Sequence, residues 1–447
     1  MGKDLLDDAP PAAPCQPAAA PGARDVARRH ADALLNTFGQ VKAALVGGEG
    51  SYLFDAAGKR YLDLLGGIAV SCLGHGHPAL VEAISAQAAS MIHTSNFFAT
   101  PAQVELAEEL LRLSLPPELC ATSRVFLSNS GTEANEAALK LALRHGGQAR
   151  PRLVALQGAF HGRSTGALSL THKEAYRAPF EPFAREVTFV APDDAEELAR
   201  ELGRGDVAAV FAEPIQGERG VVALSHDYLR AARRLCSEHG ALLVVDEVQT
   251  GSYRTGAFLA HHAAGITPDV ITLAKSLGGG VPIGATIAVG EPVCSLLGPG
   301  SHGSTFGGNP LAAAAALAVL GTVQREGLAA RIGELSRRWS RDLAALSGVA
   351  QVRAYGLLIA VELEQGADGP SSADVAAALM EAGFIVNAVT PTALRLAPPY
   401  TLSDAEADSF TRALGHILTT QAKNSALPAA GNEVGAAGGT SSTEEKR

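Results

Sequence analysis

Short apolar runs alternate with helical patterns through most of the chain. The runs are brief and aliphatic or β-branched, and they lack the alternation of apolar and polar residues that marks a strand with one wet face. This pattern predicts strands that are buried on both faces. The runs cover residues 124–128, 153–156, 187–190, 207–212, 242–245, 270–273 and 285–289.

Helical patterns separate several of these strands. Residues 133–144 are expected to form one helix, and residues 227–239 a second, with Tyr228, Leu229 and Leu235 on one face and Gly240 as the stop. The alternation of strands and helices predicts an α/β fold with a large, mostly parallel sheet that carries helices on both sides. Ligands of such sheets bind beyond the carboxyl ends of the strands.

The pattern changes after about residue 329, where a long helical stretch is followed by strand-like residues 356–362 and 394–397. We expect a large domain over 66–328 and a smaller α+β domain over 329–422. The segment 25–65 contains an expected hairpin, 51–63, that turns at Ala57 and Gly58 and packs with the smaller domain. Residues 1–24 and 423–447 have low-complexity compositions and are expected to be disordered tails.

Composition and charge exclude several classes of function. The net charge of −10 argues against a nucleic-acid surface, and no apolar run reaches the length of a membrane helix. The five cysteines are scattered without a C-x-x-C pair, which favours reduced thiols, and the acidic N-terminus is unlike a targeting signal. We therefore expect a cytoplasmic protein without a metal site, and we expect His261 and His262 at its surface.

Two of the expected strands end in charged residues. One ends in Asp246 and Glu247, and the other in Lys275, which enters the glycine loop 278–280. Taken alone, the carboxylates suggest metal chemistry or an exit into solvent, and the lysine suggests a solvated surface residue. Together they can face one bound heterocycle. Pyridoxal phosphate needs an amine for its aldehyde and a carboxylate that keeps its ring nitrogen protonated.

A third segment, Ser128-Asn129-Ser130-Gly131-Thr132-Glu133, follows a strand and opens a helix. Ser130 and Glu133 have the spacing of a capping box, so a plain helix cap is one interpretation. The other is a phosphate site at the positive end of the helix dipole, where Gly131 lets the backbone approach closely. The two interpretations are compatible.

At this point the chain resembles the class III, ornithine-type aminotransferases. The motifs that carry the resemblance cover nearly everything from about 35 to 418, and they are SNSGTEANEAALKLA, AFHGRSTGALSL, AEPIQGERGV, LLVVDEVQTG, PDVITLAKSLGGGVPIGA, HGSTFGGNPLAAAA and LRLAPPY. The resemblance implies fold type I, with a large domain around a mostly parallel seven-stranded sheet and a smaller α+β domain. YLDLLGGIAVSCLGHGHPALVEAI and TSNFFATPAQVELAE look like family members that act on N2-acetylornithine.

The resemblance also implies roles for individual residues. Lys275 corresponds to the Schiff-base lysine and Asp246 to the partner of the pyridine nitrogen. By the same resemblance, Gln249 would contact the ring's phenolic oxygen, and Phe160 would stack on the ring. The remaining expected contacts to the cofactor are those of Gly131, Thr132, Glu247, Val248 and Thr305. Thr305 would come from the other subunit of a homodimer with shared active sites, and Ser304 beside it would lie near the substrate.

The expected substrate contacts are two arginines and a glutamate. Arg163 and Arg395 correspond to carboxylate clamps, and Glu218 to a switchable partner of Arg395. An arginine binds a carboxylate through a planar two-point fork. Glutamate has two carboxylates and suits both arginines, whereas an ω-amine such as N2-acetylornithine has one, so that Glu218 would then silence Arg395.

The implied reaction transfers an ω-amino group from N2-acetylornithine or a similar amine to 2-oxoglutarate, giving a semialdehyde and glutamate in arginine biosynthesis. Ornithine, succinylornithine and 4-aminobutyrate are alternative donors. An aminomutase and a non-catalytic protein that binds pyridoxal phosphate are further alternatives. Two residues depart from the family pattern: Arg219 stands where relatives usually carry a small residue, and Tyr253 where they carry glycine. Both leave room for a specialised substrate.

Overall fold

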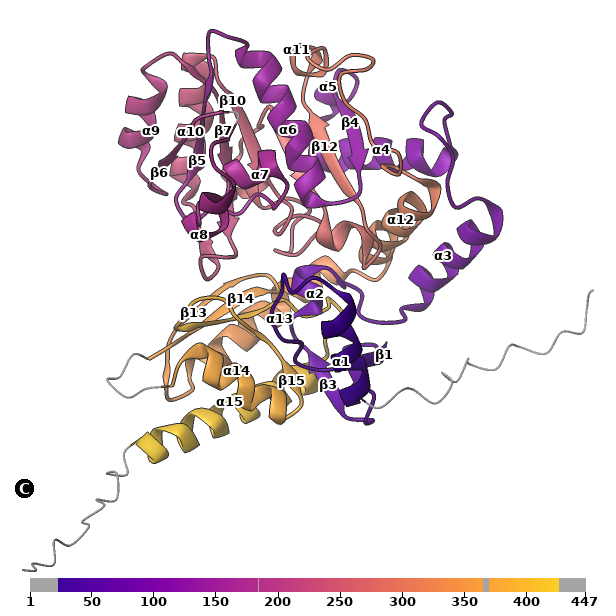
Figure 1. Cartoon of the computed structure of the whole chain (residues 1–447), viewed down its shortest axis with the longest axis vertical. Helices are drawn as coiled ribbons and strands as arrows, with labels where there is room; N and C mark the ends of the chain where they lie inside the picture. The colour runs from indigo at the N-terminus through magenta and orange to yellow at the C-terminus, as the bar shows by residue number, and fades with distance from the viewer. Residues whose placement is uncertain (1–22, 184, 365–369, 426–447) are drawn as a thin grey trace, which may run out of the picture.

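The chain folds into two lobes that are each built around β-sheets (Figure 1). The structure is a computed structural model that describes residues 23–183, 185–364 and 370–425. The upper lobe in Figure 1 holds the middle of the chain, and the lower lobe combines its two ends. In the described part of the chain, every helix is too short or too polar to cross a membrane.

A seven-stranded sheet forms the centre of the upper lobe. One strand runs antiparallel to both of its neighbours, and the other adjacent strands are parallel. The predicted fold class, with its mostly parallel seven-stranded sheet, is therefore confirmed. The spatial order is β4 (Arg124–Ser128), β12 (Gly284–Ala288, the antiparallel strand), β11 (Val270–Leu273), β10 (Leu242–Asp246), β7 (Val207–Ala212), β5 (Arg152–Leu156) and β6 (Val187–Val190).

The carboxyl ends of all these strands except β12 lie on one edge of the sheet. Asp246 is the last residue of β10, and Lys275 lies two residues beyond the end of β11. The register pairs Asp246 with Thr272 of β11. The two candidate side chains therefore start from neighbouring strand ends, at the edge where sheets of this kind bind ligands.

Helices cover both faces of the seven-stranded sheet, because each helix buries one apolar stripe against it. On one face, α9 (Ala195–Leu202) and α10 (His226–His239) pack against Val154 and Val210. On the other face, α6 (Gly131–Gly146) packs against Phe211 and Val244. Gly240 ends α10 in a left-handed conformation with φ 63°, as its sequence position predicted.

The lower lobe contains two four-stranded sheets. The first is antiparallel, in the order β13 (Val349–Tyr355), β14 (Leu358–Leu363), β17 (Ala393–Leu396) and β16 (Asn387–Ala388). The second consists of β1 (Leu45–Glu49), β2 (Tyr52–Asp55), β3 (Arg60–Asp63) and β15 (Phe384–Ile385). The predicted hairpin is β2 and β3, and β3 pairs in parallel with β15 from the C-terminal part of the chain.

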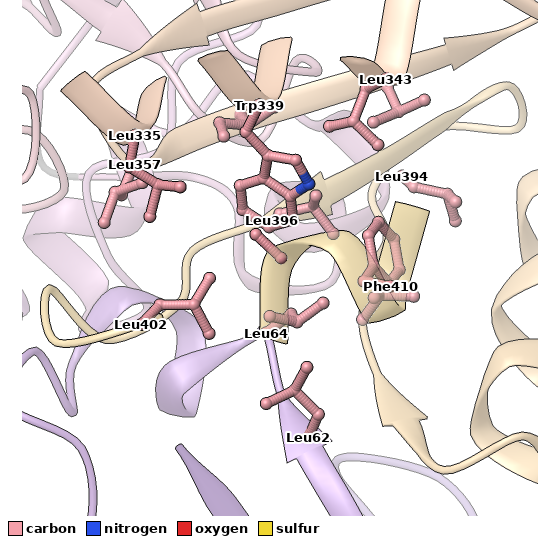
Figure 2. Packing of buried hydrophobic residues seen from close by; sticks show 14 of the residues in the cluster. Leu62, Leu64, Leu335, Trp339, Leu343, Leu357, Leu394, Leu396, Leu402 and Phe410 are labelled. Atoms are coloured by element: carbon pink, nitrogen blue, oxygen red, sulfur yellow. The ribbon is translucent and has the colours of Figure 1, made fainter. Parts of the chain in front are cut away.

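The core of the lower lobe surrounds Trp339 on α13 (Leu328–Ala344). Figure 2 shows that Leu62 and Leu64 lie in the same cluster as Leu396 of β17 and Phe410 of α15 (Asp404–Ser425). The N-terminal and C-terminal segments thus share one apolar core, so that neither forms the lower lobe alone.

Three helices pack together where this core meets the upper lobe. They are α3 (Pro78–Ser90), α4 (Pro101–Ser114) and α12 (Pro310–Arg325). Val319 of α12 belongs to the lower core, whereas Ala316 of the same helix packs with Leu106 of α4 in the upper one. Because α12 contributes to both cores, it connects the two lobes.

The remaining elements are mostly short. They are α1 (Ala23–Ala33), α2 (Gly66–Ala69), α5 (Pro117–Cys120), α7 (Thr165–Ser169), α8 (Glu174–Arg177), η1 (Ala178–Phe180), β8 (Ile215–Gln216), β9 (Val222–Ala223), η2 (Ala260–Ala264), η3 (Lys275–Gly278), α11 (Glu291–Cys294) and α14 (Ser372–Glu381). The prediction of tails over 1–24 and 423–447 is wrong for 23–24 and 423–425, which belong to α1 and α15. The rest of both predicted tails lies outside the described residues, and the domain limits stay a prediction.

Tyr253 lies where the two lobes meet. Ser252 and Tyr253 have φ values of 53° and 70°, a left-handed conformation that residues with a Cβ rarely adopt. The Tyr253 ring packs edge-on against Phe258 at 5.4 Å and touches both cores. The next residue, Arg254, is fully buried and donates a hydrogen bond to the carbonyl of Leu357. Packing from both lobes therefore holds this strained backbone in place.

We expect Phe410→Ala to lower the free energy of unfolding by about 3–5 kcal/mol, because it empties the space beside Trp339. The Phe410 and Trp339 ring centroids are 5.9 Å apart, and Trp339 is the only tryptophan of the chain. Urea unfolding followed by tryptophan fluorescence therefore reports on this cluster. Phe180→Ala is the control, because Phe180 is 63% exposed and its loss should change stability by no more than about 0.5 kcal/mol. Equal effects of the two substitutions would contradict this account of the core.

Candidate active site

A cavity of about 420 Å³ opens at the carboxyl-terminal edge of the large sheet. Most of the residues selected from the sequence line it, although they come from the ends of four different strands. They are Gly131, Thr132, Phe160, Arg163, Asp246, Val248, Gln249 and Lys275. Glu218 and Arg395 line an adjoining cavity, and Ser304 and Thr305 line a separate hollow on the other side of β4.

Asp246 places a buried carboxylate in the cavity wall. Its Oδ2 accepts a hydrogen bond from Asn135 Nδ2 at 2.7 Å and lies 2.7 Å from His161 Nδ1, and its Oδ1 accepts from the Val248 N–H at 2.9 Å. Burial alone would raise the pKa of Asp246, but the hydrogen bond and the charge of His161 outweigh it and lower the pKa. The carboxylate is therefore ionised and can keep a proton on a ring nitrogen beside it.

Lys275 supplies an amine from the next strand end. Its φ of 46° is left-handed, and backbone strain of this kind clusters at functional sites. Burial, together with the charge of Arg395, lowers the pKa of Lys275 to about 8, although Glu218 and Asp246 act in the opposite direction. Part of the amine is therefore uncharged near neutral pH, and the uncharged amine is the form that attacks a carbonyl carbon.

The N-terminus of α6 forms another side of the cavity. Ser130 caps the helix, because its Oγ accepts from the Glu133 N–H at 3.3 Å. The Glu133 carboxylate accepts instead from the Asn129 N–H at 3.0 Å, so the two residues do not close the reciprocal pair of a capping box. Within the residues that the structure describes, the N–H groups of Gly131 and Thr132 have no acceptor, so they are available to an anion.

Two glycines let the backbone come close to residues of the site. A Cβ on Gly131 would lie 2.6 Å from Val248 Cγ1, and a Cβ on Gly217 would overlap the amide of Gln249. A side chain at either position would push these neighbours aside. The short N-terminal end of α6 can therefore lie directly against the loop that follows Asp246.

The cavity fits pyridoxal phosphate at three places. Lys275 offers the amine for its aldehyde, Asp246 the carboxylate for its ring nitrogen, and the free N–H groups of Gly131 and Thr132 a seat for its phosphate. We propose these contacts, together with a stacking contact from the half-buried ring of Phe160 and a contact from the Gln249 amide.

Four residues of the site had no role assigned from the sequence, although each stood inside a quoted motif. His161 and Asn135 hold the Asp246 carboxylate, and Thr272 Oγ1 donates to Asn135 Oδ1 at 2.9 Å. Burial would lower the pKa of His161, but the hydrogen bond and charge of Asp246 raise it. Burial raises the pKa of Glu213 to about 8, and Glu213 Oε2 accepts from the Phe160 N–H at 2.9 Å. Glu213 thus fixes the backbone that carries Phe160.

Arg395 projects from β17 of the lower lobe towards the upper lobe and is 2% exposed. Its Nη1 donates to Glu218 Oε1 at 2.6 Å and lies 3.3 Å from Gln249 Oε1, and its Nη2 donates to Asn387 Oδ1 at 2.9 Å. Burial would raise the pKa of Glu218, but the charge of Arg395 and its hydrogen bond lower it. The two side chains therefore form an ion pair beside the amine of Lys275.

Arg163 differs from Arg395 in having no carboxylate partner among the described residues. Its guanidinium lies 3.6 Å from the ring centroid of Tyr176 and 5.7 Å from that of Phe160. Aromatic contacts of this kind orient a guanidinium without neutralising its charge. Arg163 is therefore free to bind a carboxylate.

Three other residues expected at the site lie apart from the cavity. Glu247 Oε1 accepts a hydrogen bond from the His261 N–H at 2.9 Å and lies 2.8 Å from His261 Nδ1. The expectation that His261 lies at the surface is wrong, because Glu247 pairs with it in the interior, where it is 1% exposed. Ser304 Oγ accepts from Asn129 Nδ2 at 2.9 Å, one contact away from the cavity, and Thr305 is exposed.

The fold and this cavity define a pyridoxal-phosphate-dependent transferase of fold type I. The sequence profile of the family "Aminotransferase class-III" matches residues 36–418. The chain belongs to the class III aminotransferases, and it is an enzyme that transfers amino groups with pyridoxal phosphate as its cofactor.

Similar proteins include two curated mycobacterial relatives. The chain is 48% identical to the acetylornithine aminotransferase of Mycobacterium tuberculosis over 387 residues, which cover 86% of this chain and 94% of the relative. It is also 48% identical to the acetylornithine aminotransferase of Mycolicibacterium smegmatis over 394 residues, or 88% and 97% of the two chains.

Two solved aminotransferase structures are also similar to this chain. The ornithine aminotransferase of Toxoplasma gondii, with partial occupancy of pyridoxal phosphate at its active site, has a TM-score of 0.83 at 31% identity, and the match covers 90% of this chain and 95% of that one. The N-acetylornithine aminotransferase of Stenotrophomonas maltophilia has a TM-score of 0.73 at 33% identity, with coverages of 86% and 97%.

The lowered pKa of Lys275 predicts how fast the amine combines with an aldehyde. The protein without cofactor should react with pyridoxal phosphate at a rate that rises with pH through about 8 and then levels off, because the amine loses its proton there. Stopped-flow absorbance measures this rate. Arg395→Gln should move the midpoint upwards, because it removes the positive charge that disfavours the ammonium form. A rate that keeps rising towards the pKa of an ordinary lysine, about 10.4, would contradict the prediction.

Proposed function

We propose that this enzyme transfers the ω-amino group of N2-acetylornithine to 2-oxoglutarate, which gives a semialdehyde and glutamate, in arginine biosynthesis. The observation that carries the proposal is the ion pair between Glu218 and Arg395 beside Lys275, while Arg163 has no carboxylate partner in the described chain. Relatives named acetylornithine aminotransferase, at 43–48% identity, support it.

With Arg395 paired to Glu218, the cavity offers one free arginine for a carboxylate. N2-acetylornithine has a single carboxylate, at the end of the molecule away from the reacting amine. Binding of that carboxylate by Arg163 would direct the ω-amine towards Lys275. The pairing of Arg395 therefore favours an ω-amine over an α-amino acid with two carboxylates.

The second half of the reaction requires a change at the same place. 2-oxoglutarate and glutamate carry two carboxylates, and Glu218 must leave Arg395 before Arg395 can bind one of them. Glu218 is the more accessible partner, with its side chain 38% exposed against 2% for Arg395. The movable member of the pair is therefore Glu218, and Arg395 is held by Asn387 during the exchange.

Pyridoxal phosphate, when bound, supplies an aldehyde that carries the amino group and a cationic ring that accepts electrons. Asp246, held by His161 and Asn135, would keep the ring nitrogen of the cofactor protonated. Lys275, as a free amine, would be the base that takes a proton from the reacting carbon of the substrate onto its Nζ. Its lowered pKa suits this task, because a base works best with a pKa close to the pH of operation.

A panel of amines tests the proposed substrate. The purified holoenzyme should use N2-acetylornithine with 2-oxoglutarate in preference to ornithine and 4-aminobutyrate, with glutamate formation as the readout. Lys275→Ala should lower the rate by at least about 10²–10⁴-fold, the usual contribution of proton transfer alone. Turnover that does not consume 2-oxoglutarate would point to an aminomutase and refute the proposal.

We also propose that the enzyme acts as a homodimer with shared active sites. Phe97, Phe98 and Phe306 are 93%, 66% and 59% exposed, which is unusual for three aromatic rings on a monomer. Phe97 lines the same hollow of about 860 Å³ as Ser304 and Thr305. A second copy that covers this surface would bring Thr305 of one subunit close to the cofactor site of the other.

The four described cysteines are free thiols, in keeping with a cytoplasmic enzyme.

Phe97→Glu should shift the protein from dimer to monomer in sedimentation velocity, because it places a charge in the centre of the proposed interface. The same substitution should lower cofactor retention and activity, since Thr305 would no longer reach the neighbouring site. Glu196→Gln, on α9 at the far edge of the large sheet, is the control and should leave the dimer intact. An active monomeric wild-type protein would remove Thr305 from the site.

A further inference from the structure

The segment that carries Arg163 rests against the first turns of α6. This segment, residues 162–164, is called the clamp loop, and α7 begins directly after it. The N–H groups of Arg163 and Ser164 both donate to Thr132 Oγ1, at 3.3 and 3.2 Å. Thr132 Oγ1 is also 2.7 Å from Ser164 Oγ. The Thr132 hydroxyl therefore contacts the clamp loop at three atoms, although its N–H belongs to the proposed phosphate seat.

Glu136 lies one turn further along α6 and holds the start of α7. Its Oε1 accepts from Ser164 Oγ at 2.6 Å and from the Ala167 N–H at 3.0 Å. Ser164 is the N-cap of α7 but makes no capping bond with its side chain. Glu136 instead satisfies one of the N–H groups that the start of a helix leaves free. Thr132 and Glu136 together anchor the clamp loop to α6.

Two glycines allow the clamp loop and α7 to lie this close to α6. A Cβ on Gly162 would overlap Thr132 Oγ1, and a Cβ on Gly166 would overlap the Glu136 carboxylate. A side chain at either position would push α6 and the loop apart. The contact therefore depends on the spacing of glycines in the segment HGRSTG.

The hydrogen bonds of this network can run in only one direction. The carboxylate oxygen of Glu136 accepts, so Ser164 donates its single hydroxyl proton to it. At the 2.7 Å contact Ser164 Oγ must then accept, and Thr132 is the donor. Thr132 thus uses its one proton on Ser164 and its lone pairs on the N–H groups of Arg163 and Ser164. Its hydroxyl has no proton left for a phosphate oxygen.

The backbone of Arg163 decides where its guanidinium can reach. The residue is exposed, and its guanidinium lies 3.6 Å from the ring centroid of Tyr176. A long exposed side chain samples many rotamers, so that a fixed backbone limits the volume in which it can meet a ligand. The Thr132 hydroxyl fixes this backbone, and with it the place at which a carboxylate can bind.

We propose that the Thr132 hydroxyl positions Arg163 for a substrate carboxylate, and that the N–H groups at the start of α6 hold the phosphate of the cofactor without this hydroxyl. The inference rests on the proposed function in one respect, the role of Arg163 as the carboxylate clamp. Thr132 and Glu136 act on the substrate through Arg163 and are positioning residues for it. Loss of the hydroxyl should therefore weaken substrate binding and leave cofactor binding almost unchanged.

The test is Thr132→Val, which replaces the hydroxyl by a methyl group. Glutarate has the two carboxylates of 2-oxoglutarate without its reacting carbonyl, and its dissociation constant is measured on the holoenzyme from the absorbance of the bound cofactor. This constant should rise about fivefold or more, the usual effect of one lost hydrogen bond. The KM for 2-oxoglutarate should rise with it and kcat should change much less, because the contact is remote from the reacting atoms.

The affinity for the cofactor is the second readout. Equilibrium dialysis of the protein without cofactor against pyridoxal phosphate should give a dissociation constant for Thr132→Val within about twofold of the wild-type value, because the N–H groups at the start of α6 remain. Weaker cofactor binding in this variant would overturn the inference, since the hydroxyl would then hold the phosphate.

Three further variants make the result specific. Thr132→Ser keeps the hydroxyl and should recover most of the glutarate affinity that Thr132→Val loses. Ser164→Ala removes the acceptor of the Thr132 proton and should also weaken glutarate binding without weakening cofactor binding. Because Ser164→Ala leaves Thr132 in place, it tests the network even if Thr132→Val does not fold. The matched control is Thr420→Val, whose exposed hydroxyl donates to the carbonyl of His416 within α15, and it should leave both constants unchanged.

Arg163→Gln separates this inference from the proposed function. If Arg163→Gln weakens glutarate binding and Thr132→Val does not, Arg163 remains the clamp and this inference alone is overturned. If Arg163→Gln leaves glutarate binding unchanged, Arg163 is not the carboxylate clamp, and the proposed function and this inference both lose that residue.

Discussion

A buried carboxylate that must stay ionised is the constraint around which this site is built. Asp246 is 3% exposed, and a charge in such a position is costly unless several donors stabilise it. The backbone N–H of Val248, the amide of Asn135 and the imidazole of His161 supply that stabilisation. Each donor comes from a different part of the chain. The parallel sheet, α6 and the loop after β5 must therefore all be in place before Asp246 can act on a bound ring.

The amine of Lys275, beyond the end of the neighbouring strand, must instead be uncharged to react. Lys275 has to lose its proton at moderate pH, and its surroundings favour this through burial and the nearby charge of Arg395. Arg395 belongs to the lower lobe, and Asp246 and Lys275 belong to the upper one. The reactivity of the lysine therefore depends on how the lobes are joined. The left-handed backbone at Tyr253 and the shared helix α12 keep that joint in one arrangement.

Much of the fold and of the site could be predicted from the sequence, because the patterns that indicate them lie within short segments of the chain. The seven strands of the large sheet follow from short apolar runs, and the neighbouring positions of Asp246 and Lys275 follow from the order of charged residues at strand ends. His161, Asn135 and Glu213 escaped attention because their function lies in contacts between distant segments, such as His161 with Asp246. His261 was placed wrongly for the same reason: its partner, Glu247, is a buried acid on another segment. Helix α1 begins earlier than composition suggested, since propensity says little about where a terminal helix starts.

The most direct test of this account is to reduce the holoenzyme with borohydride and map the modified peptide by mass spectrometry. Reduction makes the bond between the cofactor and its amine permanent. The account predicts one pyridoxyl group per chain, on Lys275, and none on the protein with Asp246→Ala, where the ring has lost its anchor. A label on another lysine, or an unchanged label on Lys275 without Asp246, would show that the two side chains do not hold the same molecule.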